Sequence, residues 1–207
     1  MRLRDHGNNF SSGVSFDAFV ISGNLSAFCQ HPQLTIPTSE CTVLSELYSG
    51  TNGSGRTNHD GRFSTVNVED RFGIKTIGSS NPKHVEGIYL QKSTGPDVPG
   101  VPSQRDGNNL SGNLPTSMSG LIYLKDLYLS ENQIDGNLPV DLPSLSALQR
   151  LYAYDNQLTG SLMTGLQRLT GLQILDLHNN TLHGSLPAAL GEMTGLQGLD
   201  LSSNAFV

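Results

Sequence analysis

The sequence predicts an α/β solenoid, a single elongated domain in which copies of one short unit stack on each other behind a helical N-terminal cap. A period of 24 residues is shared by three independent registers. They are the asparagines Asn132, Asn156, Asn180 and Asn204, the glycines Gly112, Gly136, Gly160 and Gly184, and the leucines Leu114, Leu138, Leu162 and Leu186. A fixed period with leucines at set offsets is typical of a solenoid, whose units bury their apolar faces against their neighbours. Glycine and proline also recur inside the units, which excludes a bundle of long helices.

The units follow the pattern L-x-x-L-x-L-x-x-N-x-L-x-G-x-L-P, with Ala153 and Met163 as substitutions in the copy that begins at Leu148. One copy consists of Leu124, Leu127, Leu129, Asn132, Ile134, Gly136, Leu138 and Pro139. Through this pattern the chain resembles the leucine-rich repeat family in its plant-type subclass. The resemblance implies a right-handed solenoid with a short parallel β-sheet on the concave face and an irregular or 3-10 convex side. It also implies a ladder in which the recurrent asparagine amides bond the backbone of adjacent turns, here Asn108, Asn132, Asn156, Asn180 and Asn204.

The leucines of L-x-L alternate with period two, so each unit offers a short strand with leucines inward and the x positions outward. About five such strands are expected between residues 85 and 207. Their outward residues are Gly87, Tyr89 and Gln91; Asp126, Tyr128 and Ser130; Arg150, Tyr152 and Tyr154; Ile174, Asp176 and His178; and Gly198, Asp200 and Ser202. A further apolar set packs the convex side: Met118, Leu142, Leu166 and Leu190 with Leu121, Leu145, Leu169 and Met193.

Residues 39–84 are expected to form the cap that covers the open apolar edge of the first unit. A helix is predicted from Ser39, which can cap it, to Gly50. Its apolar face consists of Val43, Leu44, Leu47 and Tyr48. The segment 43–53, with its Leu-Tyr-x-x-Thr-Asn-Gly motif, resembles the N-terminal cap of leucine-rich repeat proteins from algae, oomycetes, other protists and plants. The chain departs from that pattern because it has no tryptophan and lacks the flanking cysteines of many plant members.

Residues 1–38 are expected to form a poorly ordered leader, because polar residues and Asp17 interrupt the apolar stretch that a signal peptide needs. A signal peptide and a misplaced start codon are the alternatives. The chain has two cysteines, Cys29 and Cys41. They could pair in a secreted chain or remain two free thiols, and spacing alone does not decide between these.

Residues 93–107 interrupt the first unit between its strand and Asn108. The repeat is restored when they are left out, and they contain three glycines and three prolines that suit neither helix nor strand. The segment is either a functional loop at the edge of the concave face or translated non-coding sequence. At the other end the last unit is truncated after Asn204, which leaves apolar residues near an open edge and predicts a fragment, or association through that uncapped end.

Four of the six tyrosines, Tyr89, Tyr128, Tyr152 and Tyr154, cluster on the predicted concave surface. Tyrosine offers a rigid contact area and a hydroxyl group, which suits recognition of a peptide, protein or glycan. Alternatively, the rings stack along the sheet only to stabilise it. Arg150 beside Asp126 is expected to make an exposed ion pair of small worth.

Toward the C-terminal end the central outward position becomes Asp176 and then Asp200, with His178 adjacent. Two carboxylates about 5 Å apart on neighbouring strands could hold a cation or share a proton, and His178 could act as a base. Solvated aspartates without chemistry are common at these positions in the family that the chain resembles, so we expect neither a catalytic nor a metal site. The expected ligand-binding residues are Tyr89, Tyr128, Tyr152, Tyr154, Arg150, Asp126, Asp176 and His178.

Composition excludes several functions. The chain has 207 residues, a formal net charge of −6 and 14% charged residues, which disfavours binding to nucleic acid. It contains no apolar run of the roughly 18 residues that a membrane helix needs. Nucleophile elbows, Cys/His metal spacings, nucleotide-binding glycine loops and kinase motifs are absent from the sequence, so no cofactor is expected. Five Asn-x-Ser/Thr acceptors, at Asn9, Asn24, Asn52, Asn109 and Asn179, are compatible with a glycoprotein.

The sequence therefore predicts a non-enzymatic module that recognises a protein or peptide on its concave face, in a receptor-like or secreted protein. An extracellular or cell-surface location is favoured over a cytoplasmic one. One alternative is the ectodomain portion of a receptor-like serine/threonine kinase whose catalytic domain lies outside this chain. A second alternative is an intracellular scaffold.

Overall fold

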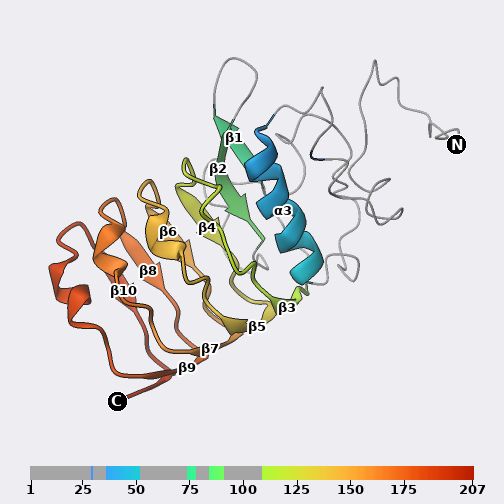
Figure 1. The fold of residues 1–207 in the computed structure, drawn as a ribbon. Helices are drawn as coiled ribbons and strands as arrows, with labels where there is room; N and C mark the ends of the chain where they lie inside the picture. The colour runs from blue at the N-terminus through green and yellow to red at the C-terminus, as the bar shows by residue number, and fades with distance from the viewer. Residues whose placement is uncertain (1–28, 30–35, 52–73, 78–83, 91–108) are drawn as a thin grey trace, which may run out of the picture.

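A computed structural model describes residues 29, 36–51, 74–77, 84–90 and 109–207 of the chain. These residues form a curved solenoid in which one row of strands lines the inner face and a second row follows the lower edge (Figure 1). The helix α3 (Thr38–Gly50) lies at the N-terminal end, beside the first strands of both rows. The predicted α/β solenoid with a helical cap is confirmed.

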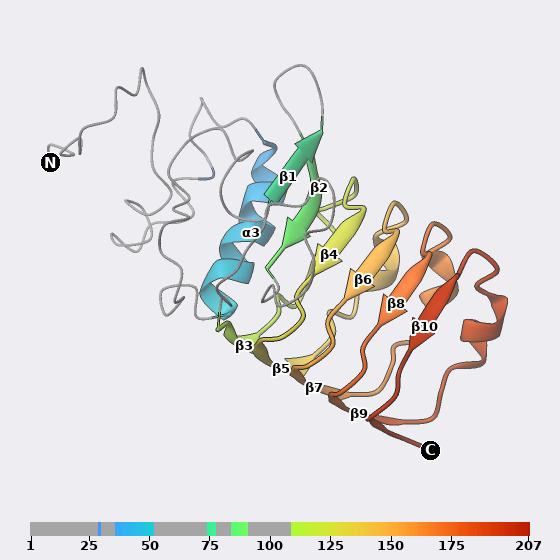
Figure 2. The same cartoon turned by 180° about the vertical axis from the view of Figure 1, so that it is seen from behind.

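The inner row is a six-stranded sheet in the order β1-β2-β4-β6-β8-β10 (Figure 2). Its strands are β1 (Ile74–Ile77), β2 (His84–Tyr89), β4 (Asp126–Tyr128), β6 (Arg150–Tyr152), β8 (Ile174–Asp176) and β10 (Gly198–Asp200). β1 pairs antiparallel with β2, and all the other pairs are parallel. From β4 onward each residue pairs with the one 24 positions later, as Leu127 does with Leu151. The repeat period is therefore the register of the sheet.

The half-unit after each ladder asparagine forms a second parallel sheet, which the sequence did not predict. Its strands are β3 (Ser111–Asn113), β5 (Gln133–Asn137), β7 (Gln157–Gly160), β9 (Thr181–Gly184) and β11 (Ala205–Phe206). The recurrent glycines belong to these strands. At Gly136 φ is +70°, and an added Cβ would lie 2.7 Å from Oδ1 of Asn113 in the preceding unit. Glycine is required there by both backbone conformation and space.

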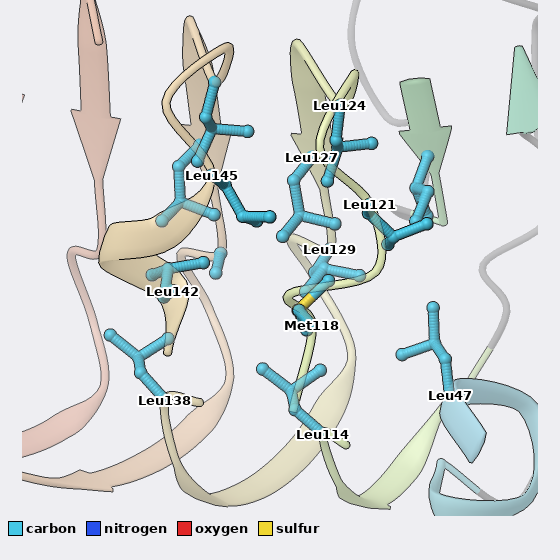
Figure 3. Packing of buried hydrophobic residues seen from close by; sticks show 14 of the residues in the cluster. Leu47, Leu114, Met118, Leu121, Leu124, Leu127, Leu129, Leu138, Leu142 and Leu145 are labelled. Carbon is cyan, nitrogen blue, oxygen red and sulfur yellow. The ribbon is translucent and has the colours of Figure 1, made fainter. Parts of the chain in front are cut away.

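Short 3-10 helices complete the convex side, as the resemblance implied. They are η2 (Leu142–Ser144), η3 (Leu166–Arg168) and η4 (Ala188–Glu192). Their leucines and the strand leucines point into one continuous core (Figure 3). Leu121, Leu145 and Leu148 are fully buried, and Leu47 joins the same cluster from α3. The helix thus covers the apolar edge of the first unit.

The recurrent asparagines connect the units through their side-chain amides. Nδ2 of Asn156 donates to the carbonyl groups of Leu129, Ala153 and Tyr154 at 3.0, 3.3 and 3.1 Å, and its Oδ1 accepts from the N–H of Ile134 at 3.0 Å. Asn132, Asn180 and Asn204 make equivalent bonds. These bonds satisfy backbone groups that the solenoid would otherwise leave unpaired.

The prediction that Ser39 caps the helix is wrong. The helix begins at Thr38, the N-cap position is Pro37, and no side chain bonds there. Cys41 donates its N–H to the carbonyl of Pro37 at 3.0 Å, so Ser39 lies within the first turn. Proline suits this boundary because its extended backbone needs no partner for an N–H. The apolar face is as predicted, with Val43, Leu44 and Leu47 buried and Tyr48 packed against them.

Two residues from the segment expected to be a leader pack against α3. Cys29 forms a disulfide with Cys41, with their Cα atoms 5.5 Å apart, which settles the question that spacing left open. Ile36 is also buried. Pro37 and Thr38 form the start of the helix, and the rest of the expected leader lies outside the described residues, as do the insertion 93–107 and Asn108. Among the described helices, none has the length and apolar character needed to cross a membrane.

Candidate functional site

The concave face of the inner sheet carries three columns of outward side chains, as the 24-residue alignment predicts. We define the central column as Tyr89, Tyr128, Tyr152, Asp176 and Asp200, which pair in register on β2, β4, β6, β8 and β10. Gly87, Asp126, Arg150, Ile174 and Gly198 form the first column in the same way. Tyr154 and His178 follow their strands in the third column, where the N–H of Asp155 bonds the carbonyl of His178.

The tyrosines of the central column are stacked. Ring centroids are 5.0 Å apart between Tyr89 and Tyr128 and 4.8 Å apart between Tyr128 and Tyr152, both in tilted geometry. Tyr89 is only 3% exposed and Tyr128 only 8%, whereas Tyr152 and Tyr154 are half-buried. The stack therefore combines both interpretations of the sequence: its first two rings stabilise the sheet, and its C-terminal end is accessible.

Tyr89 owes its burial to Gly87, two residues earlier on the same face of β2. Its ring lies over the glycine, so an added Cβ would be 2.6 Å from both Cε2 and the hydroxyl oxygen of Tyr89. The hydroxyl donates to Oδ2 of Asp126 at 2.8 Å. Gly87 is one of the predicted outward residues, but the repeat pattern assigns it no role. The signal that could have found it is a residue without a side chain beside the first tyrosine of a column.

Asp126 is the centre of a buried polar group. Besides the bond from Tyr89, its Oδ1 accepts from Nε of Arg150 at 2.6 Å, and the Asp126 side chain is only 4% exposed. The prediction of an exposed ion pair is therefore wrong for Asp126, because the phenol of Tyr89 bonds its carboxylate and helps to bury it. Arg150 therefore neutralises a buried carboxylate.

This environment perturbs the ionisation of several groups. Burial, followed by the hydrogen bond to Asp126, raises the pKa of Tyr89 above its usual range. Burial also raises the pKa of Tyr128 to about 12. The hydrogen bond to Asp126 raises the pKa of Arg150. All three groups thus keep their protonated forms at physiological pH.

The C-terminal half of the face brings together Tyr154, Asp176, His178 and Asp200. Nδ1 of His178 lies 2.7 Å from Oδ1 of Asp176 and 3.8 Å from Oδ2 of Asp200, and the His178 ring stacks on Tyr154 at 4.6 Å. Burial opposes protonation of His178, but the hydrogen bond to Asp176 and the charges of Asp176, Asp200 and Asp155 outweigh it and raise the pKa. Hydrogen bonds from Ser202 lower the pKa of Asp200.

Asp176, His178 and Asp200 place their potential ligand atoms within 4.8 Å of one another. Such a group can share a proton, attract a positive charge or hold a cation. Sequence analysis weighed this possibility and expected no metal site.

Charge is distributed unevenly along the face. Toward the N-terminal end Lys125 and Arg150 each have a buried acidic partner: Nζ of Lys125 lies 2.7 Å from Glu86, and Arg150 bonds Asp126. On β8 and β10 and in the residues that follow these strands, the outward positions carry Asp176 and Asp200 but neither lysine nor arginine. The accessible end of the face is therefore acidic.

Comparisons with known proteins agree with the fold. The family model described as Leucine Rich Repeat matches residues 123–145 and 171–193. No curated protein matches the chain. The ectodomain of the receptor kinase SOBIR1 from Arabidopsis thaliana is similar, with a TM-score of 0.65, 23% identity and coverage of 84% of this chain and 83% of that one.

Other solved structures share the fold. The BIR3–SERK2 complex from Arabidopsis thaliana contains a chain with a TM-score of 0.60 and 23% identity, covering 79% of this chain and 81% of that one. A plant ice-binding protein has a TM-score of 0.64 and 21% identity, covering 83% of this chain and 50% of that one. At these identities the likeness extends to the fold alone, so function has to be argued from the site.

Proposed function

Because the chain is a leucine-rich repeat protein with the fold of plant leucine-rich repeat ectodomains, we propose that it is a non-enzymatic module that binds a protein or peptide on its concave face. The observation that carries the proposal is the pair of half-buried tyrosines, Tyr152 and Tyr154, on an open parallel sheet. The ligand-contacting residues we propose are these two, together with Arg150, Asp176 and His178.

Both tyrosines are held in place before any ligand arrives. Tyr152 stacks on Tyr128, and Tyr154 lies parallel to the ring of His178 with an interplanar angle of 8°. Side chains that are already fixed lose little conformational entropy on binding, which favours affinity. Half-exposed, ordered tyrosines are also enriched among residues that dominate binding energies. We assign Tyr89, Tyr128 and Asp126, which are buried, a supporting role: they hold Tyr152 and Arg150 in place and do not contact the ligand themselves.

The disulfide between Cys29 and Cys41 supports a location outside the cytoplasm. Disulfides persist in secreted and cell-surface proteins, whereas the cytosol keeps most thiols reduced. We therefore propose that the chain belongs to a receptor-like or secreted protein and meets its partner outside the cell.

The test is selection from a phage-displayed library of random 12-residue peptides against the purified chain. We expect the enriched peptides, made synthetically, to lose affinity by about 30-fold for the double variant Tyr152→Ala/Tyr154→Ala, the loss typical of dominant contact residues. Tyr123→Ala is the matched control, because Tyr123 is an exposed tyrosine (44%) outside the three columns. Circular dichroism and thermal melting check that the variants fold. Equal affinity for the wild type and the folded double variant would contradict the proposal.

A further inference from the structure

We propose that the ligand on this face is a peptide with a cationic side chain, arginine or lysine, that lies over Asp176 and Asp200 beside Tyr152. This inference rests on the proposed function and names the chemical class of its partner. It concerns the accessible end of the central column, where β6, β8 and β10 lie side by side.

Asp176 and Asp200 carry negative charge that neither Lys125 nor Arg150 offsets. Lys125 and Arg150 are engaged by Glu86 and Asp126, so they do not neutralise the aspartates on β8 and β10. The described cation nearest those aspartates is His178, which carries a charge only when protonated. While His178 is neutral, the accessible end of the face therefore attracts a positive group and repels an acidic one.

The carboxylates of Asp176 and Asp200 can each accept further hydrogen bonds. Oδ1 of Asp176 is occupied by His178, and Oδ1 of Asp200 accepts from the N–H and hydroxyl of Ser202 at 2.9 and 2.6 Å. Among the described residues, no hydrogen bond engages Oδ2 of either aspartate. Adjacent strands are about 4.8 Å apart, a spacing that one guanidinium or ammonium group can bridge. The internal bonds thus orient both carboxylates and leave one oxygen of each for a ligand.

An aromatic side chain, that of Tyr152, lies in the same column as the two aspartates, next to Asp176. Tyr152 pairs with Asp176 across β6 and β8, so its ring flanks the position at which the cation would sit. Cations favour the face of an aromatic ring, and this preference strengthens where carboxylates add to the negative potential. A neutral polar ligand would gain little from this combination. An acidic ligand would be repelled.

His178 makes the proposed contact sensitive to pH. The groups facing its ring are Asp176 at the end of β8, Asp200 at the end of β10, and Tyr154 and Asp155, which follow β6. Protonation places a positive charge between the two aspartates, where it competes with the cation of the ligand. Because the pKa of His178 is raised above its ordinary 6.5, this competition is present at pH 6 and is lost as the pH rises through the raised pKa. Affinity for a cationic peptide should therefore be lower at pH 6 than at pH 8.

The experiment uses peptides enriched from the random library, with EDTA present to remove metal ions. We expect arginine or lysine at one recurrent position. Replacing that residue with citrulline or acetyl-lysine, which are neutral but similar in size, should weaken binding by about tenfold. The double variant Asp176→Asn/Asp200→Asn should bind the original peptide about tenfold more weakly than the wild type does. This variant should bind the original peptide and the neutral peptide with the same affinity. Asp135→Asn, which alters an exposed aspartate on β5, is the matched control and should have no effect.

The pH measurement gives an independent readout. The cationic peptide should bind less tightly at pH 6 than at pH 8, and the neutral peptide equally at both. His178→Gln should remove the difference.

The outcomes separate this inference from the proposed function. Peptides that depend on Tyr152 and Tyr154, but show no cationic preference and no loss with Asp176→Asn/Asp200→Asn, would overturn the inference and leave the proposed function standing. Peptides that depend on neither the tyrosines nor the aspartates, or a library that yields no binder, would overturn both.

Discussion

Gly87 illustrates how a single residue arranges the recognition surface. The space above its Cα is filled by the ring of Tyr89, whose hydroxyl then reaches Asp126. Asp126 in turn fixes Arg150 at 2.6 Å. One missing side chain at the start of the first column thereby allows a chain of contacts that supports the tyrosine stack.

Gly87→Ala should lower the free energy of unfolding by about 1–3 kcal/mol, because the new methyl group has to displace the ring of Tyr89. Urea denaturation gives this value. Gly198→Ala is the matched control from the same column: its Cβ would meet only Ile174, at an ordinary 3.7 Å, so its stability should stay within about 0.5 kcal/mol of the wild type. Equal effects at the two positions would show that Gly87 has no special packing role.

At this scale the sequence predicts columns but not burial. The 24-residue period suffices to place Tyr89, Tyr128 and Tyr152 in register, because strand pairing repeats with the unit. It does not show that Asp126 and the first two rings are covered. Burial depends on which way each ring leans and on the size of its neighbours, and the repeat pattern contains neither. The expected exposed pair at Asp126 failed for this reason.

Among the elements, helix α3 is joined to β2 by a buried carboxylate. Oε2 of Glu40 accepts the N–H of Val85 at 2.6 Å, and Oε1 lies 2.7 Å from Nδ1 of His84. Glu40 is only 2% exposed. The helix thus contributes a specific polar anchor in addition to its apolar face, which fixes how it lies on the edge of β2.

Glu40→Ala should destabilise the protein by about 2 kcal/mol or more, since the buried N–H of Val85 loses its acceptor. Glu46→Ala is the matched control, because Glu46 is an exposed glutamate on the same helix and its loss should have a small effect. Urea denaturation compares the two variants. Similar losses of stability would mean that the anchor contributes little.

Prediction of the elements was successful where periodicity governs them and failed where tertiary contacts do. Apolar spacing identified the helix and its buried face. It could not reveal the anchoring role of Glu40, because an acidic residue in the first turn of a helix is common on exposed helices too. The second sheet was missed because its strands are short and contain the recurrent glycine, which weakens strand propensity until neighbouring units pair.

Over the whole molecule, stability and recognition follow from the same repetition. Each unit contacts only its neighbours, so the core extends from α3 to β11 and the asparagine ladder runs from Asn132 to Asn204. The same stacking aligns outward positions into columns, in which the Asp126–Arg150 pair gives way to two aspartates, Asp176 and Asp200, with His178 beside them. A linear change in sequence thereby becomes a gradient of charge along the concave face.

Asn156→Ala tests how far the ladder maintains this continuity. The substitution removes three donated bonds and one accepted bond, and leaves the N–H of Ile134 and the carbonyl of Leu129 without this partner. Because unsatisfied buried backbone groups are costly, the free energy of unfolding should fall by about 3 kcal/mol or more. Hydrogen exchange at the amide of Ile134 should accelerate selectively.

Asn137→Ala is the control for this substitution, because Asn137 is an exposed asparagine at the end of β5. Its stability should remain within about 0.5 kcal/mol of the wild type. If both asparagine variants lose the same stability, or if exchange at Ile134 is unchanged in Asn156→Ala, backbone pairing and apolar packing join the units without a contribution from the ladder. A larger loss in Asn156→Ala would instead show that the ladder transmits stability between units, so that damage to one repeat also weakens the tyrosine surface on the next.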